Sequence, residues 1–60
     1  MFTKTFTITF DTGNAAFADD PAIEIVRILR EVADRIENCA RFPDYVYDLN
    51  GNHIGEIINN

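Results

Sequence analysis

The first part of the chain alternates between apolar and polar residues with a period of two. Over residues 2–10, F-T-K-T-F-T-I-T-F, one parity is apolar except at Lys4, and the other parity is threonine throughout. The apolar members are Phe2, Phe6, Ile8 and Phe10. This period is typical of a strand with one buried and one wetter face. The turn-forming run D-T-G-N at 11–14 then ends the predicted strand.

The middle of the chain, residues 21–40, repeats its apolar residues at a helical spacing. At 100° per residue they gather on one side, which holds Ala22, Ile25, Val26, Ile28, Leu29, Val32, Ala33, Ile36, Cys39 and Ala40. The other side holds Glu24, Arg27, Arg30, Glu31, Asp34, Arg35, Glu37 and Asn38, with Ile23 as an apolar exception. Asp20 is suited to the N-cap and Pro21 to the first helical position. These features predict a helix of about five turns, packed on a sheet by its apolar side.

Two features flank this helix. Before it, residues 15–18 are expected to form a short helical turn that anchors Phe17 on the core. On its charged side, opposite charges four residues apart predict weak surface pairs, and that side is expected to be solvated. These pairs are Arg27–Glu31, Glu31–Arg35 and Arg30–Asp34.

The last part of the chain has the composition of a β-hairpin. Residues 45–47 are Y-V-Y, and Asn50-Gly51 is a strong short hairpin signal that leads into a second arm over residues 52–58. A two-residue turn would pair Tyr47 with Ile54 and Asp48 with His53. In the second arm Ile54 and Ile57 have opposite parity, and a bulge at Gly55 would let both face the core.

The predicted fold class is therefore α+β. Its order is β-α-β-β, a three-stranded, mostly antiparallel sheet with one amphipathic helix packed on one face, in a single domain over residues 1–60. We expect the last strand in the centre, antiparallel to both others. The alternative pairs the first and second strands in parallel through a right-handed crossover.

Composition narrows the function classes. Apolar residues make up 47% of the chain, enough for a core, but sixty residues fold with little stability to spare, so a homodimer is a physical expectation. The net charge of −5, from 10 acidic and 5 basic residues, argues against direct nucleic-acid binding. The apolar runs are too short for a membrane span, and the N-terminus has no signal-peptide pattern. The single Cys39 then suggests a reducing, cytoplasmic location.

Several short motifs resemble chemical sites, and in each the structural interpretation is favoured. The run D-T-G at 11–13 is shared with aspartic proteases, yet as a strand-ending turn it needs only local hydrogen bonds. The run D-L-N-G-N at 48–52 begins like a calcium loop but lacks the glycine and glutamate that such a loop requires. His53 has no nucleophile nearby, and Cys39 is expected to be a small buried apolar residue. No catalytic residue, metal ligand or cofactor is predicted.

The best candidates for a functional site are partner-binding residues. Acidic residues outside the helix predict a negative patch for a basic protein surface. They are Asp11, Asp19, Asp20, Asp44, Asp48 and Glu56. Tyr45, Tyr47 and the outlying Ile23 are the apolar interface candidates, since tyrosine is favoured at interfaces. A helix on one sheet face also leaves the threonine-striped face open to a partner or a second copy.

Three runs together resemble a group of small proteins encoded by phages and prophages. They are F-T-I-T-F-D-T-G-N-A-A-F at 6–17, R-I-L-R-E-V-A-D-R-I at 27–36 and D-L-N-G-N-H-I-G-E at 48–56. The resemblance implies an accessory protein that binds and blocks a host machine, of which anti-CRISPR proteins are the best-known kind. The expected partner is then a basic surface of a host nucleoprotein complex. The alternative is a small self-associating structural module with no inhibitory role.

Overall fold

The structure is a computed structural model that describes residues 4–39 and 41–60. Its elements are strand β1 (Phe6–Phe10), the 3-10 turn η1 (Ala15–Phe17), helix α1 (Pro21–Cys39), strand β2 (Tyr45–Tyr47) and strand β3 (His53–Asn59). The predicted β-α-β-β order is confirmed. Residues 2 and 3 of the first predicted strand and residue 40 of the predicted helix lie outside the described residues.

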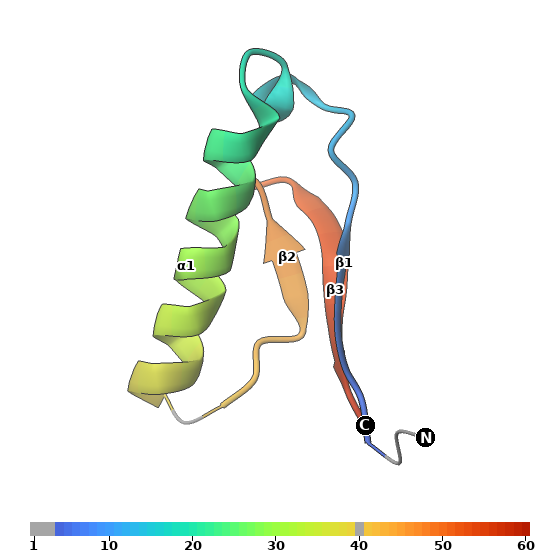
Figure 1. The fold of residues 1–60 in the computed structure, drawn as a ribbon, viewed down its shortest axis with the longest axis vertical. Coiled ribbons are helices and arrows are strands. Elements are labelled where there is room, and N and C mark those ends of the chain that lie inside the picture. Colours follow the sequence, from blue (N-terminus) through green and yellow to red (C-terminus); the bar gives the residue numbers. More distant parts are fainter. Residues whose placement is uncertain (1–3, 40) are drawn as a thin grey trace.

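The sheet places its last strand in the centre. Its order is β1-β3-β2, and β3 runs antiparallel to both neighbours. The expected central position of the last strand is therefore confirmed, and the parallel alternative is wrong. Figure 1 shows β1 and β3 side by side on one side of the molecule, with β2 between β3 and α1 in this view.

The period-two pattern of β1 separates its two faces as predicted. Ile8 lies opposite Ile57 and Phe10 opposite Gly55, and both β1 residues pack against the buried core. That core consists of Phe17, Ile28, Val32, Val46 and Ile57. Thr7 and Thr9 of the other parity are exposed. Phe17 is only 2% exposed, so η1 does anchor it in the core as expected.

The hairpin between β2 and β3 has a longer loop than predicted. The amide of Asp48 donates to the carbonyl of Asn52 at 3.0 Å, and the amide of Gly51 donates to the carbonyl of Asp48 at 3.0 Å. The loop therefore holds residues 49–51, and Gly51 has a φ of 83°, the left-handed conformation that closes a three-residue hairpin loop. The predicted pairs of Tyr47 with Ile54 and Asp48 with His53 are wrong, because Tyr47 lies opposite His53.

A β-bulge in β3 shifts its register against β2 by one residue after the loop. Tyr47 is opposite His53 and Val46 is opposite Gly55, which leaves Ile54 without a partner on β2. The extra residue lets Ile54 pack against the core although it differs in parity from the buried Ile57. The predicted effect of a bulge is confirmed, with the bulged residue at Ile54 and Gly55 beside it.

Helix α1 begins as predicted. The Oδ1 atom of Asp20 accepts a hydrogen bond from the amide of Ala22 at 3.1 Å, as an N-cap does, and Pro21 occupies the first helical position. On the charged side, Arg27–Glu31 and Glu31–Arg35 form ion pairs of 2.8 and 3.1 Å.

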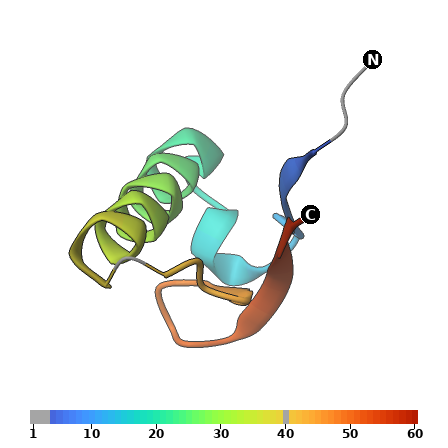
Figure 2. The same ribbon diagram turned by 90° about the horizontal axis from the view of Figure 1, so that it is seen from below.

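The apolar side of α1 is covered along a narrower line than predicted. Ile28 and Val32 are buried, whereas Val26 and Leu29 are each 45% exposed. The predicted burial of Cys39 is wrong, because this residue is exposed. The physical reason is the position of the helix, which lies over the β2 side of a narrow sheet (Figure 2). The flank of the helix that is turned away from β2 therefore has none of the described strands beneath it.

Gly55 is required by the close approach of β1 and β3, and its replacement gives a stability test. A Cβ atom at Gly55 would collide with the carbonyl oxygen of Thr9 and lie within 2.6 Å of the Cα atom of Phe10. We expect Gly55→Ala to lower the free energy of unfolding by about 3 kcal/mol, because backbone atoms cannot yield as side chains do. Urea unfolding followed by circular dichroism measures this loss.

Gly13→Ala is the matched control for Gly55→Ala. A Cβ atom at Gly13 would meet only the flexible side chain of Asp11, at 3.1 Å from Oδ1. Its effect on the free energy of unfolding should stay below about 1 kcal/mol. Equal losses in the two variants would contradict the close approach of the strands at Gly55.

Candidate interaction surface

The sheet face turned away from α1 carries a group of exposed aromatic rings. Tyr45 and Tyr47 come from β2 and are 50% and 43% exposed, and His53 comes from β3 and is also exposed. The ring centroid of His53 lies 4.8 Å from that of Tyr45 and 5.7 Å from that of Tyr47. We call Tyr45, Tyr47, His53 and the exposed Glu56 the outer-face cluster.

Local strand geometry explains why these side chains meet. Residues alternate between faces along a strand. Because Val46 is buried on the helix side, its neighbours Tyr45 and Tyr47 lie on the outer face. The bulge at Ile54 places His53 opposite Tyr47, next to both tyrosines. Glu56 lies opposite Tyr45 across the β2–β3 pair. His53 was missed as a site residue because its neighbours depend on this register, which the Asn50-Gly51 signal does not specify.

Asp11 borders the outer-face cluster. It directly follows β1, is exposed and lines an open hollow of about 530 Å³ together with His53 and Glu56. The structure thus brings together four of the predicted binding residues, Asp11, Tyr45, Tyr47 and Glu56.

The predicted Asp44 lies on the helix side instead. It is exposed, and its carbonyl accepts the amide of Ile57 at 2.9 Å, which fixes the start of β2. It lines a separate hollow beside Arg35 and Cys39 of α1, so it does not join the outer-face cluster.

Three other predicted residues lie elsewhere. Asp19 and Asp20 are exposed before α1, and Asp20 is occupied as the helix cap. Ile23 is 69% exposed and borders a shallow surface formed by α1 alone, beside Arg27 and Arg30. These residues form no common surface with the outer-face cluster.

Asp48 was expected to contribute an exposed charge, and this expectation is wrong because the residue is only 4% exposed. Its Oδ1 atom accepts the amides of Asn50 and Asn52, each at 2.9 Å. Its Oδ2 atom accepts the side-chain amides of Asn52 at 3.0 Å and Asn14 at 2.6 Å. The carboxylate therefore organises the hairpin loop and joins it to η1, whose N-cap is Asn14. Both oxygens of the first acidic residue in the calcium-loop pattern at 48–52 therefore accept hydrogen bonds from amide groups.

Glu24 was placed on the solvated side of the helix, and this too is wrong. It is 5% exposed, pairs with Arg27 at 2.6 Å and accepts the backbone amide of Leu49 at 2.9 Å. Arg27 also approaches the carbonyl of Tyr47 at 3.5 Å. The charged side of α1 therefore docks the helix onto the hairpin loop instead of being wholly solvated.

These hydrogen bonds decide the protonation of both carboxyl groups. For Glu24, the hydrogen bond from Arg27 outweighs desolvation and lowers the pKa, with a further contribution from the Leu49 amide. For Asp48, desolvation raises the pKa, but the hydrogen bonds from Asn52, Asn50 and Asn14 together outweigh it, and the pKa is lowered. Both groups are thus held as carboxylates at neutral pH.

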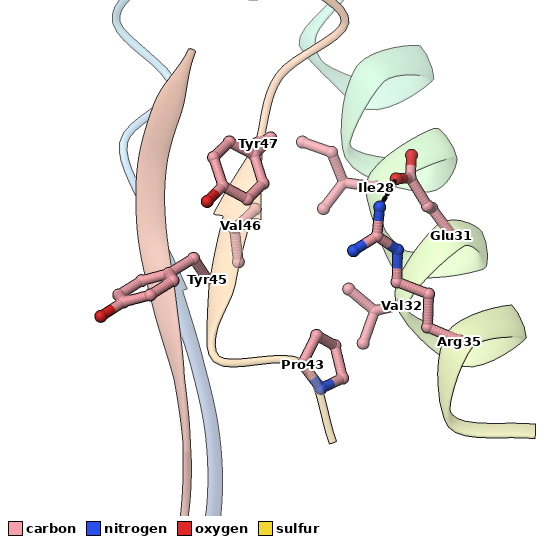
Figure 3. A pocket seen from close by; sticks show the side chains of 8 residues that line it. All are labelled: Ile28, Glu31, Val32, Arg35, Pro43, Tyr45, Val46 and Tyr47. Atoms are coloured by element: carbon pink, nitrogen blue, oxygen red, sulfur yellow. Dashed lines mark hydrogen bonds and ion pairs between the residues drawn. The ribbon is translucent and has the colours of Figure 1, made fainter. Parts of the chain in front are cut away.

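The hollow between α1 and β2 is small. Figure 3 shows Ile28 and Val32 directed from α1 toward β2, Pro43 at one end and the ring of Tyr45 directed away from the helix. Its volume of about 10 Å³ has room for about one water molecule. Among residues 4–39 and 41–60, no group of three or more His, Cys, Asp or Glu side chains is placed to hold a metal ion.

Comparisons with protein-family models, curated proteins and solved structures gave no match to this chain. In the described part of the chain, no helix has the length and apolar character needed to cross a membrane.

Acid titration tests the roles of the two buried carboxylates. Because the folded-state pKa values of Glu24 and Asp48 are lowered, their stabilisation is fully present above the ordinary carboxyl range of about 4. It should be lost as the pH falls through that range toward the folded-state pKa values. Thermal unfolding by circular dichroism should therefore show a steady midpoint from pH 7 to about pH 5 and a falling midpoint below that.

Asp48→Asn separates the contribution of Asp48 from that of the other acids. The amide replaces one acceptor oxygen with a donor that faces the amides of Asn14 and Asn52. We expect a lower midpoint at pH 7 and a smaller decrease between pH 5 and pH 3 than in the unmodified chain. An unchanged midpoint at pH 7, or an unchanged decrease in acid, would contradict this assignment.

Proposed function

We propose that this protein acts by binding another protein through its outer sheet face and that it carries out no catalysis. The observation that carries the proposal is the outer-face cluster, in which two half-exposed tyrosines and His53 surround one another beside Glu56. Exposed rings held this close by strand register form a preformed surface. The rings therefore lose little conformational entropy when a partner docks there.

The chemistry of the cluster favours a cationic side chain of the partner. Ring faces attract an arginine or lysine by cation–π interaction, and a neighbouring carboxylate adds a charge-assisted hydrogen bond. Tyr45 and Glu56 lie on opposite strands at paired positions, so both can contact the same side chain. Arginine suits this site best, because its planar guanidinium stacks on a ring while its edge binds a carboxylate.

The distribution of charge supports a basic partner. Helix α1, on the other side of the sheet from the outer-face cluster, carries three arginines and four acidic residues, so its charges nearly balance. Asp11 and Glu56 line the hollow at the outer face, which has no lysine or arginine in its described lining, and the chain as a whole has a net charge of −5. Such a field steers a positively charged surface toward the acidic side of the protein and accelerates its association.

Two features support a binding role over an enzymatic one. The hollow between α1 and β2 has room for about one water molecule, and the larger hollows are open to solvent. The two buried carboxylates, Glu24 and Asp48, already accept hydrogen bonds from protein donors. Nothing among these groups supplies a nucleophile beside a base, which catalysis by covalent attack requires.

The resemblance to phage-encoded accessory proteins supplies the context for the partner. On that basis we place the target among host defence machines, as a basic surface of a CRISPR effector complex. Proteins in such complexes hold nucleic acid in positively charged channels. An acidic, aromatic face fits such a channel wall and would compete there with the nucleic-acid backbone.

The test compares two variants of the protein against purified CRISPR effector complexes. Tyr45→Ser with Tyr47→Ser removes the two tyrosine rings of the outer-face cluster, and Ile23→Ser removes a more exposed apolar side chain on α1. We expect the tyrosine variant to bind at least 30-fold more weakly, as for interface residues that dominate affinity. The Ile23 variant should bind within about twofold of the original protein.

A phage-plaquing assay gives the functional result. Cells with active CRISPR immunity should lose protection when they express the original protein and keep it when they express the tyrosine variant. Binding should also weaken as salt is raised, because the attraction is electrostatic. Full immunity together with no binding to any effector complex would reject the defence-inhibitor proposal. Equal weakening by the Ile23 variant would reject the outer face as the binding surface.

A further inference from the structure

We infer that the free edge of β1 is a pairing site for a second copy of this chain. In this arrangement two β1 strands run antiparallel with Ile8 opposite Ile8 of the second copy. The two three-stranded sheets then form one continuous sheet of twice the width, with both helices on the same side. The inference uses the edge of β1 and does not depend on the function proposed for the outer face.

The hydrogen-bond directions of β1 show which backbone groups are available. The amide of Asp11 donates to the carbonyl of Ile54, and the amide of Asn60 donates to the carbonyl of Thr5, each at 2.9 Å. In an antiparallel pair such residues alternate, so the odd-numbered residues of β1 direct their backbone groups toward β3. The amides and carbonyls of Phe6, Ile8 and Phe10 are therefore directed to the opposite edge, where residues 4–39 and 41–60 supply no further strand.

The sequence of β1 is symmetric about Ile8. It reads F-T-I-T-F over Phe6–Phe10. An antiparallel pair centred on Ile8 places Phe6 opposite Phe10, Thr7 opposite Thr9 and Ile8 opposite itself. Because Phe6, Ile8 and Phe10 carry the outward backbone groups, each of these positions falls on a hydrogen-bonded pair. A two-fold interface requires this kind of self-complementary surface, and a second copy is the occupant that has it.

The two edges of the sheet differ in their protection. The strand β1 has five residues and contains no charge, proline or bulge, the features that keep edge strands from pairing. The other edge is β2, which has only three residues, and its Tyr47 carbonyl is approached by Arg27 at 3.5 Å. Further along, the β2 side faces the ion-paired Glu31 and Arg35 of the helix (Figure 3). The β1 edge is thus the one open to a strand.

Apolar side chains on the helix side of β1 favour the same occupant. Phe6 is 44% exposed although it has the inward parity of its strand. Leu29, which is 45% exposed, lies on the side of α1 roughly opposite Arg27, the residue that approaches the β2–β3 hairpin at the Tyr47 carbonyl. A second β1 strand would bring its own Phe6, Ile8 and Phe10 to this side of the sheet. The apolar inner layer would then continue from one copy into the next.

Backbone N-methylation tests the inference without altering a side chain. A chemically synthesised chain with an N-methyl group at Ile8 loses the edge donor while its β1–β3 hydrogen bonds stay intact. Sedimentation equilibrium should give twice the 6.8 kDa chain mass for the original chain at micromolar concentration. It should give a folded monomer for the Ile8 variant. An N-methyl group at Tyr45, whose amide is directed to the β2 edge, should leave the dimer unchanged.

Each other outcome of this test overturns the proposal. A folded monomer for the original chain at micromolar concentration means that the edge does not pair. A dimer that survives methylation at Ile8 means that another surface makes the contact. Dissociation by methylation at Tyr45 alone assigns the contact to β2. Circular dichroism of every chain confirms that the compared proteins are folded.

A matched charge pair then tests the register. The variant Thr7→Lys with Thr9→Lys places lysine opposite lysine twice across the proposed pair. The variant Thr7→Glu with Thr9→Lys places glutamate opposite lysine twice, and in both variants the lysine that replaces Thr9 lies opposite Glu56 of its own chain. We expect the dimer dissociation constant of the first variant to exceed that of the second by at least about tenfold. Equal dissociation constants would reject the pairing of residue 7 with residue 9.

Discussion

The hydrogen bonds to the Asp48 carboxylate join the hairpin loop to the segment before α1, and they add a polar connection to the hydrophobic core that holds Phe17 of that segment. Through Asn14 the carboxylate contacts the segment before α1, and through Asn50 and Asn52 it shapes the hairpin loop. The same loop meets the helix one residue later, where Leu49 donates to Glu24. Since the buried core consists of only a few apolar side chains, these polar contacts determine how α1 sits on the sheet.

The sequence predicted the elements well, because each carries a local signal. Alternating threonine in β1, the Asp20-Pro21 start of α1 and Asn50-Gly51 in the hairpin are all readable without tertiary contacts. The burial of Glu24 and Asp48 could not be predicted, because a carboxylate at a helical or turn position is expected to be solvated unless its hydrogen-bond donors are known. One donor to each carboxylate comes from a distant residue: Leu49, 25 positions from Glu24, and Asn14, 34 positions from Asp48. The same limit applied to Val26, Leu29 and Cys39, whose exposure depends on where the helix lies over the sheet.

The proposed binding residues show a similar division. Tyr45 and Tyr47 were found from residue type and Glu56 from its charge, and the structure places them on one face. His53 joins them only through a register that combines a three-residue loop with a bulge at Ile54. Two small deviations from a regular hairpin therefore create the aromatic group. Neither deviation changes which residues belong to the strands, so the strand pattern of the sequence predicts neither of them.

The order of the strands has a consequence for how the chain is made. The strand β3 lies between β1 and β2, and it is synthesised after both of them. Until then β1 has no partner within its own chain, and both of its edges carry free backbone groups. The sheet therefore completes only after synthesis of residues 53–59, in a step that closes contacts distant in sequence. During this interval, nascent chains on neighbouring ribosomes of one messenger RNA expose unpaired F-T-I-T-F segments to one another. Because such segments can associate, the yield of folded protein depends on the expression level and on the supply of chaperones.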